Sequence, residues 1–157
     1  MKPPQFAKLL AALQAARDEV AREDAIDDLA WIFYSANWEV AEGEPILQKL
    51  VNMIDHETNM RVRDSILEAL EDAHGLPDSW KRKEIRLDLD PLVRWLGALE
   101  NTNMTGYMHR ILYILGESGQ SKYRDVCAKY LDYSNQDVRE AAEFAVERLT
   151  RVGPEQG

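Results

Sequence analysis

The 157-residue sequence is poor in several residue types, and each shortage argues against a class of protein. Its single cysteine, Cys127, cannot form an internal disulfide, so we expect a reducing compartment and a cytoplasmic protein. Basic residues are few: 19 lysines and arginines face 28 acidic residues, for a net charge of −9. This balance argues against nucleic acid and anionic membranes as partners, because both are bound through lysine and arginine. Lys8, Gln14 and Arg17 interrupt the first apolar stretch, so neither a signal peptide nor a transmembrane helix is predicted.

Motifs for catalysis and cofactor binding are missing as well. The sequence has no HExxH, CxxC, GxGxxG or P-loop motif, and Gly116-Glu117-Ser118-Gly119 lacks the GxSxG spacing of a nucleophile elbow. Neighbouring acids such as Asp27 and Asp28 diverge around a helix, whereas acid–base catalysis needs groups that converge. Cys127 is predicted to be a small buried side chain. We therefore predict a non-enzymatic protein with no cofactor and no bound metal.

Glycine and proline, with 8 and 6 residues, cluster at joints between segments whose apolar residues recur every three or four positions. That spacing is helical, and no segment has the period of two that marks a strand. The sequence therefore predicts an all-α fold. We expect about eight helices: Pro4 to Val20, Asp24 to Val40, one starting at Glu44-Pro45, Asn59 to Ala73, Asp90 to Leu99, Met104 to Leu115, Ser121 to Leu131 and Asn135 to Thr150.

Two of the expected helices align with each other without gaps. The segment from Val62 to Leu70 matches the segment from Val138 to Val146: each begins with Val-Arg and an acid. The second helix fits the same frame if Ile26 takes the valine position, and the sixth fits if Tyr107 does. The helices then form about four pairs of roughly 30 to 45 residues.

This pattern resembles a HEAT repeat. The resemblance rests on Gly116-Glu117-Ser118-Gly119, a helix ending at Leu131-Asp132, and Asn135 leading into Asp137-Val138-Arg139-Glu140-Ala141-Ala142. Met53-Ile54-Asp55 followed by Arg61-Val62-Arg63 resembles a second copy; the likeness is good over 44–73 and 110–150 and weaker over 1–43 and 90–109. It implies a right-handed α-α solenoid in a single domain, 1–157, that binds a protein along its second helices. It also implies a structural role for Arg63 and Arg139, each reaching a turn aspartate of a neighbouring repeat (Asp55, Asp132 or Asp137).

Residues 75–89 depart from the repeat as an insertion. They carry a basic cluster, Lys81, Arg82, Lys83 and Arg86, in an otherwise acidic chain. Two interpretations stay open: a solvated connector with Trp80 packed on the edge of the core, or an arm that contacts a partner or a second subunit.

The aligned register predicts a continuous partner-binding face on the second helices. Positions two, five, six and nine residues after the core valine turn away from the first helices, and equivalent positions of stacked repeats form columns. The predicted face comprises Asp28, Trp31, Asp64, Leu67, Glu68, Glu71, His109, Leu112, Tyr113, Glu140, Glu143, Phe144 and Glu147. The alternative is that the apolar members are covered by adjacent repeats and the acids are merely solvated. Among the aromatics, Trp38 and Trp80 are expected to be the most exposed and Trp31 and Tyr34 are more often core residues.

Together these features favour a protein-binding module. The specific hypothesis is a small acidic immunity or inhibitor protein, as bacteria often make, that neutralises a basic toxin or nuclease through charge steering and aromatic anchors. The alternative is an adaptor or assembly factor that holds a client protein. HEAT-like enzymes that excise alkylated bases need a cationic groove, and HEAT-like helpers that attach pigments need a chromophore site; the sequence indicates neither. The oligomeric state stays open.

Overall fold

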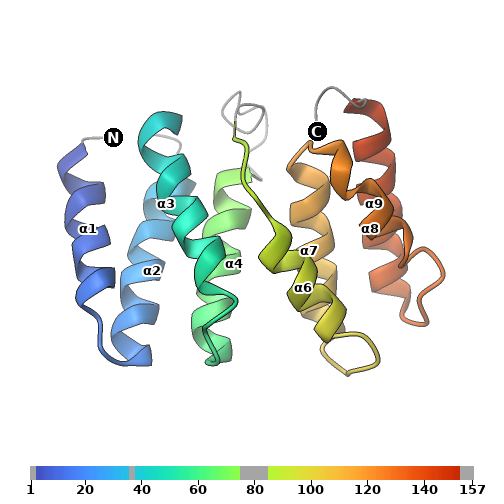
Figure 1. Ribbon diagram of the computed structural model, residues 1–157, viewed down its shortest axis with the longest axis horizontal. Helices are drawn as coiled ribbons and strands as arrows, with labels where there is room; N and C mark the ends of the chain where they lie inside the picture. Colours follow the sequence, from blue (N-terminus) through green and yellow to red (C-terminus); the bar gives the residue numbers. More distant parts are fainter. Residues whose placement is uncertain (1–2, 36–37, 75–84, 153–157) are drawn as a thin grey trace. The chain divides into compact units, whose positions relative to one another are not determined.

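The computed structural model describes residues 3–35, 38–74 and 85–152, and within them every regular element is a helix (Figure 1). The predicted all-α fold is confirmed. The elements are α1 (Pro3–Ala15), α2 (Glu19–Tyr34), α3 (Val40–Met53), α4 (Met60–His74), α6 (Asp90–Ala98), α7 (Thr105–Glu117), the 3-10 helix η1 (Ser121–Tyr123), α8 (Arg124–Ala128) and α9 (Gln136–Val152).

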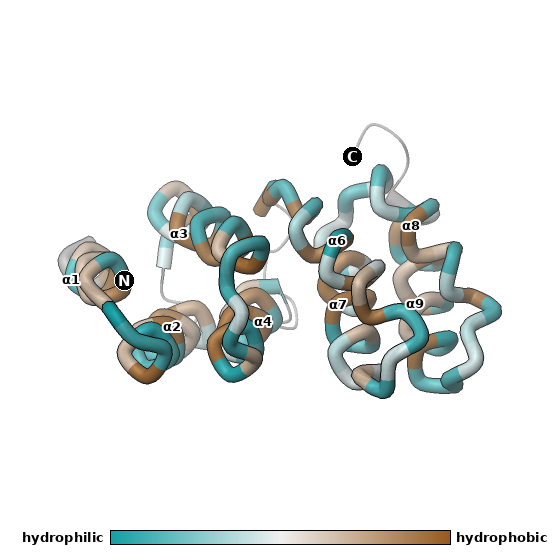
Figure 2. The backbone as a smooth tube through the Cα atoms, turned by 60° about the horizontal axis from the view of Figure 1, so that its bottom comes forward, coloured by the Kyte–Doolittle hydropathy of each residue, from teal (hydrophilic) through white to brown (hydrophobic). Residues whose placement is uncertain are grey.

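The chain divides into two compact units, Met1–Asp88 and Leu89–Gly157. Each unit holds two helical hairpins, and the second helices of the two hairpins pack side by side: α2 with α4, and α7 with α9. Figure 2 shows α3 on one side of the α2–α4 layer in the first unit, and α6 and α8 on one side of the α7–α9 layer in the second. The two units therefore repeat one plan, which supports the predicted helix pairs.

Several helix boundaries differ from those expected. The first helix ends at Ala15 and a second starts at Glu19, where one helix was expected to run on to Val20. The break is set by Asp18, whose carboxylate accepts a hydrogen bond from the amide of Ala21 at 2.9 Å and so caps α2. The third helix starts at Val40, ahead of Pro45. The seventh predicted helix consists of the short η1 and α8 instead of one longer helix.

The two aligned helices, α4 and α9, are each preceded by an asparagine at the equivalent position. The side chain of Asn59 accepts a hydrogen bond from the amide of Val62 at 3.2 Å, and that of Asn135 accepts one from the amide of Val138 at 3.1 Å. Each asparagine thus satisfies an amide that the first helical turn leaves unpaired. Both copies read Asn-x-x-Val-Arg, so the repeat extends three residues further toward the N-terminus than the predicted alignment.

The arginine of this motif fastens the turn before its helix. Arg63 donates hydrogen bonds to the carbonyls of Glu57 at 2.7 Å and Ile54 at 2.9 Å. Arg139 likewise donates to the carbonyl six residues before it, that of Tyr133, at 2.8 Å. The predicted structural role of both arginines is confirmed. These acceptors are main-chain carbonyls of the same hairpin.

Burial corrects the register of α7 by one residue. Ile26, Val62 and Val138 are fully buried, and in α7 the fully buried residue is Met108, whereas Tyr107 is half-buried. The prediction that Tyr107 takes the valine position is therefore wrong. A shift of one residue turns a helix by about 100°, so it changes which α7 side chains lie beside α9.

An aromatic cluster builds the core of the first unit. Phe33 of α2 contacts Phe6 of α1, with ring centroids 5.4 Å apart, and meets Trp38 edge-on at 5.0 Å. Trp38 is buried, and its indole nitrogen donates a hydrogen bond to the carbonyl of Phe33 at 3.1 Å. The expectation that Trp38 is exposed is wrong, because its one polar atom has a partner inside the core. Gly43 makes room for it: a Cβ there would lie 2.5 Å from the Trp38 ring.

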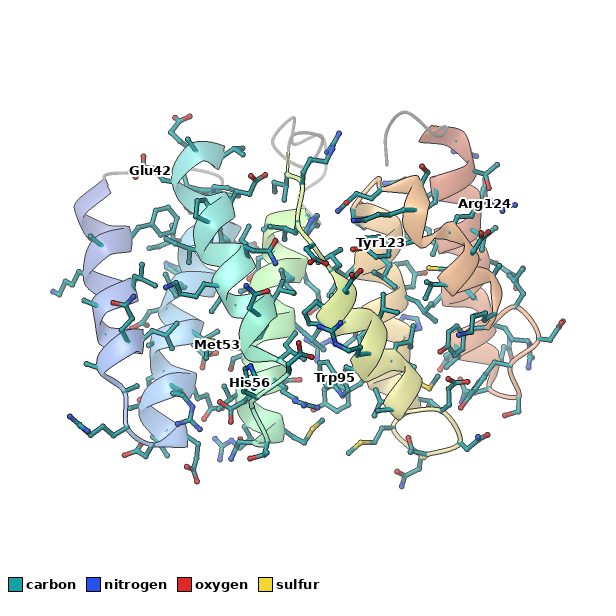
Figure 3. All side chains as sticks on the ribbon, viewed as in Figure 1. Glu42, Met53, His56, Trp95, Tyr123 and Arg124 are labelled. Atoms are coloured by element: carbon teal, nitrogen blue, oxygen red, sulfur yellow. The ribbon has the colours of Figure 1, made fainter. Side chains whose placement is uncertain are left out.

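Residues 85–89, the described end of the predicted insertion, are partly buried. Ile85, Leu87 and Leu89 are buried and alternate with exposed residues. In the first unit, the amide of Asp88 donates to the side chain of Gln48 at 2.8 Å. In the second, the amide of Leu89 donates at 2.8 Å to the hydroxyl of Tyr123, which Figure 3 labels. Trp80 and the lysines and arginine at 81–83 lie outside the described residues.

Candidate functional site

The solvent-facing side of α2 combines large exposed apolar side chains with exposed acids. Val20, Asp24, Asp27, Trp31 and Tyr34, which we call the α2 face, are all exposed. Trp31 is 73% exposed, Val20 61% and Tyr34 57%, and these are three of the four large hydrophobic residues exposed in the described chain. The buried residues of α2, such as Leu29 and Phe33, lie on the opposite side of the helix.

An open hollow adjoins the α2 face. The Trp31 and Tyr34 rings stack, with centroids 5.8 Å apart and planes 19° from parallel. Trp31 also lines a hollow of about 300 Å³ with Asp28 and Ile32 of α2 and with Lys8 and Leu9 of α1. The hollow therefore offers an indole, two aliphatic side chains and one group of each charge to an incoming side chain.

The three aspartates of α2 differ from most acids of the described chain in having no partner. Among the described residues, Asp24, Asp27 and Asp28 take part in no hydrogen bond or ion pair. Other acidic side chains are paired: those of Glu23 with Arg61, Glu57 with Arg22, Glu117 with Arg148, Glu147 with Arg151 and Glu140 with Gln136. Three carboxylates without a partner therefore lie on the helix that carries the exposed Trp31 and Tyr34 rings.

A second acidic group lies along α4, in the same unit. Glu68 is exposed, and Asp64 and Glu71 are half-buried. Burial, with the nearby charges of Glu68 and Glu71, raises the pKa of Asp72 to about 6. Asp72 was missed in the predicted face; its position one residue after Glu71 was the only signal that could have found it.

The predicted residues of the second unit form an aromatic row across α7 and α9. The rings of His109 and Tyr113 lie 4.8 Å apart, and those of Tyr113 and Phe144 stack at 4.4 Å. Arg148 lies over the Phe144 ring at 5.3 Å and pairs with Glu117 at 3.2 Å. These side chains are half-buried and already partnered, so the row contributes to packing between the two helices.

Two members of the predicted face are core residues. Leu67 and Leu112 are fully buried, so the expectation that they lie on an exposed surface is wrong. Trp31 is exposed, in agreement with its place in the predicted face, whereas Tyr34 is exposed although it was expected in the core. The remaining acids of the predicted face on α9, Glu140, Glu143 and Glu147, are exposed. The structure therefore shifts the centre of the candidate site to α2.

The buried charge of the first unit serves the fold. Arg22 holds the carboxylate of Glu57 through two nitrogens, at 2.7 and 3.1 Å, and the amide of Asn59 donates to it at 3.1 Å. Burial acts to raise the pKa of Glu57, but these hydrogen bonds and the charges of Arg22 and Arg63 outweigh it and hold that pKa below its usual value. The pair ties α2 to the turn before α4.

Cys127 is buried as predicted, and burial raises the pKa of its thiol to about 12. Within 3–35, 38–74 and 85–152, no group of three or more histidine, cysteine or acidic side chains is placed to hold a metal ion. Nor is any of the helices described there both long and apolar enough to cross a membrane.

In comparisons with protein-family models, with curated proteins and with solved structures, nothing matches this chain.

Proposed function

We propose that the protein is a non-enzymatic, HEAT-like α-solenoid that binds a basic partner protein through an acidic and aromatic face centred on α2. The observation that carries the proposal is the exposed Trp31–Tyr34 stack beside three carboxylates that have no partner in the described chain. Exposed aromatic residues supply binding energy when an interface covers them, and unpaired charge supplies steering.

The more specific role that we propose is inhibition. An acidic surface on a chain of net charge −9 is complementary to the basic active cleft of a nuclease or of another toxin. Attraction between opposite charges can raise association rates to about 10⁸–10⁹ M⁻¹s⁻¹ at low salt. A cytoplasmic immunity protein would use such a surface to occupy the cleft before the nucleic acid does.

The test is a pull-down with the tagged full-length protein from its native cells, at low and at physiological salt, with the retained proteins identified by mass spectrometry. We expect one stoichiometric basic partner that salt releases, because screening weakens exposed charge attraction. Asp28→Lys with Glu68→Lys should abolish its retention, and Asp125→Lys with Asp132→Lys is the matched control at two other exposed acids. Several salt-resistant partners would favour an adaptor, and no partner, or equal loss in both variants, would refute the proposed site.

A further inference from the structure

Five of the exposed residues of α2, those of the α2 face, follow the spacing of a seam along which a second helix could dock. Val20, Asp24, Asp27, Trp31 and Tyr34 are separated by steps of four, three, four and three residues. At about 100° per residue they fall within an arc of about 80°, and at about 1.5 Å per residue they span about 21 Å. This alternation averages 3.5 residues, the period at which one helix keeps a continuous stripe against another.

No described element of this chain covers the α2 face, which we also call the seam. Trp31, Val20 and Tyr34 are more than half exposed, and Asp24 and Asp27 are exposed with no partner among the described residues. The buried side of α2 already packs against α1 and α4. Among the described residues, the α2 face is therefore a second surface of this helix against which nothing packs.

We infer that α2 docks an amphipathic, basic α-helix of the partner protein along this seam. The inference rests on the proposed protein-binding function and adds the shape and chemistry of the segment that is recognised. Lysine or arginine of the partner helix would lie opposite Asp24 and Asp27, and apolar residues would cover Trp31 and Tyr34. The two aspartates make the complex less stable than a fully apolar interface would, but they favour a basic partner helix over other helices.

The charges around the seam favour a basic helix over a second copy of this chain. α2 exposes three aspartates, at positions 24, 27 and 28, and the hollow beside it holds one cation, Lys8, together with Asp28. A second α2 would bring its own aspartates toward this seam, in a protein whose net charge is already −9. An arginine at the edge of the partner helix could enter the hollow, with its stem on Leu9 and Ile32 and its guanidinium against Trp31 and Asp28.

The test uses designed helical peptides as the probe, with binding to the full-length protein followed by fluorescence anisotropy. The seam peptide carries leucine opposite Val20, Trp31 and Tyr34 and lysine opposite Asp24 and Asp27, in one version for each helix direction. A scrambled peptide of the same composition places these lysines on the opposite side of its helix. We expect one seam peptide to bind about tenfold or more tighter than the scrambled peptide, because only the seam peptide pairs its charges at the interface.

Charge reversal sharpens the test. Asp24→Lys with Asp27→Lys should weaken binding of the seam peptide about tenfold or more, and a peptide with glutamate in the two lysine positions should then bind this variant best. Asp125→Lys with Asp132→Lys makes the same change in net charge at other exposed residues and should leave the preference for the seam peptide intact. Equal binding of seam and scrambled peptides, or equal loss in both variants, would overturn the inference.

The same variants separate this inference from the proposed function. If Asp24→Lys with Asp27→Lys still retains the cellular partner in the pull-down, the protein binds its partner elsewhere, and the helix-docking inference fails alone. If the unmodified protein retains no partner, the proposed function fails, and the peptide preferences still decide whether α2 selects a basic helix.

Discussion

Replacing Gly116 of α7 by alanine should lower the stability of the protein. A Cβ at this position would lie 2.9 Å from the Cα of Ala145 and 3.1 Å from both the Cβ of Ala145 and the ring of Phe144. The nearest of these atoms is backbone of α9, so a rotamer change cannot relieve the clash. Gly116→Ala should therefore force α7 and α9 apart.

The expected size follows from two opposing effects. Overpacking a close contact costs about 1–3 kcal/mol, while replacing glycine by alanine within a helix gains up to about 1 kcal/mol. The matched control is Gly106→Ala, in the first turn of the same helix, where a new Cβ would meet nothing within 4 Å. Comparing the two variants cancels much of the propensity gain, so Gly116→Ala should be less stable than Gly106→Ala by about 1–3 kcal/mol.

The assay is urea unfolding followed by circular dichroism, with the free energy of unfolding extrapolated to water for both variants. A less stable Gly116→Ala would show that the α7–α9 contact is as close as described. If Gly116→Ala proves as stable as Gly106→Ala, the two helices have room to separate, and the reasoning about the aromatic row built on their contact is refuted.

Two further predictions concern the acids of the first unit. Glu57→Gln should lower the free energy of unfolding by about 2–3 kcal/mol, because it leaves the Arg22 guanidinium without its charged partner. The control is Glu23→Gln, at the exposed pair with Arg61, which should cost less than about 1 kcal/mol in the same urea assay. Equal losses in the two variants would contradict the structural role of the pair between Glu57 and Arg22. Asp72→Asn should raise stability above pH 6 and lose that advantage as the pH falls toward 4. The folded-state pKa of Asp72 is raised to about 6 from 3.8, so its carboxylate opposes folding above that value and its protonation favours folding below it. Thermal unfolding from pH 4 to 8 measures the difference, and a constant gain across that range would refute the assignment.

Periodicity was sufficient to predict the helices and their pairing, because each helix buries one stripe of apolar residues and leaves the others to solvent. It could not place the break at Asp18, since the apolar spacing of α1 continues into the start of α2 and only the capping side chain marks the boundary. It also could not choose between Tyr107 and Met108, because two adjacent apolar residues fit the same frame. Burial separates them: Met108 is fully buried and Tyr107 is not.

Sequence alignment predicted only part of the candidate site, because it does not determine which side chains are covered. Trp31 and Leu67 occupy the same position in the aligned helices, and from the sequence both were placed on one face. In the structure Trp31 is 73% exposed and Leu67 is fully buried. Alignment fixes the direction in which a side chain leaves its helix, but its exposure depends on which neighbours cover that direction, and those neighbours are set by the tertiary structure. The unpaired state of the α2 aspartates is likewise a property of the contacts around them.

The aspartates of α2 lower the stability of their own helix. Asp24 lies three residues before Asp27 and four before Asp28, and like charges at these spacings destabilise a helix by about 0.2–0.5 kcal/mol per pair. The same helix exposes Trp31 and Tyr34 to solvent, although apolar side chains of this size stabilise a protein only when they are buried. Other parts of the chain avoid both costs, since Arg148 and Arg151 of α9 each neutralise a nearby glutamate and Trp38 is enclosed in the core. The α2 face combines unpaired acids with uncovered aromatic rings. This combination is better explained by a partner that pairs the acids and buries the rings than by the requirements of folding.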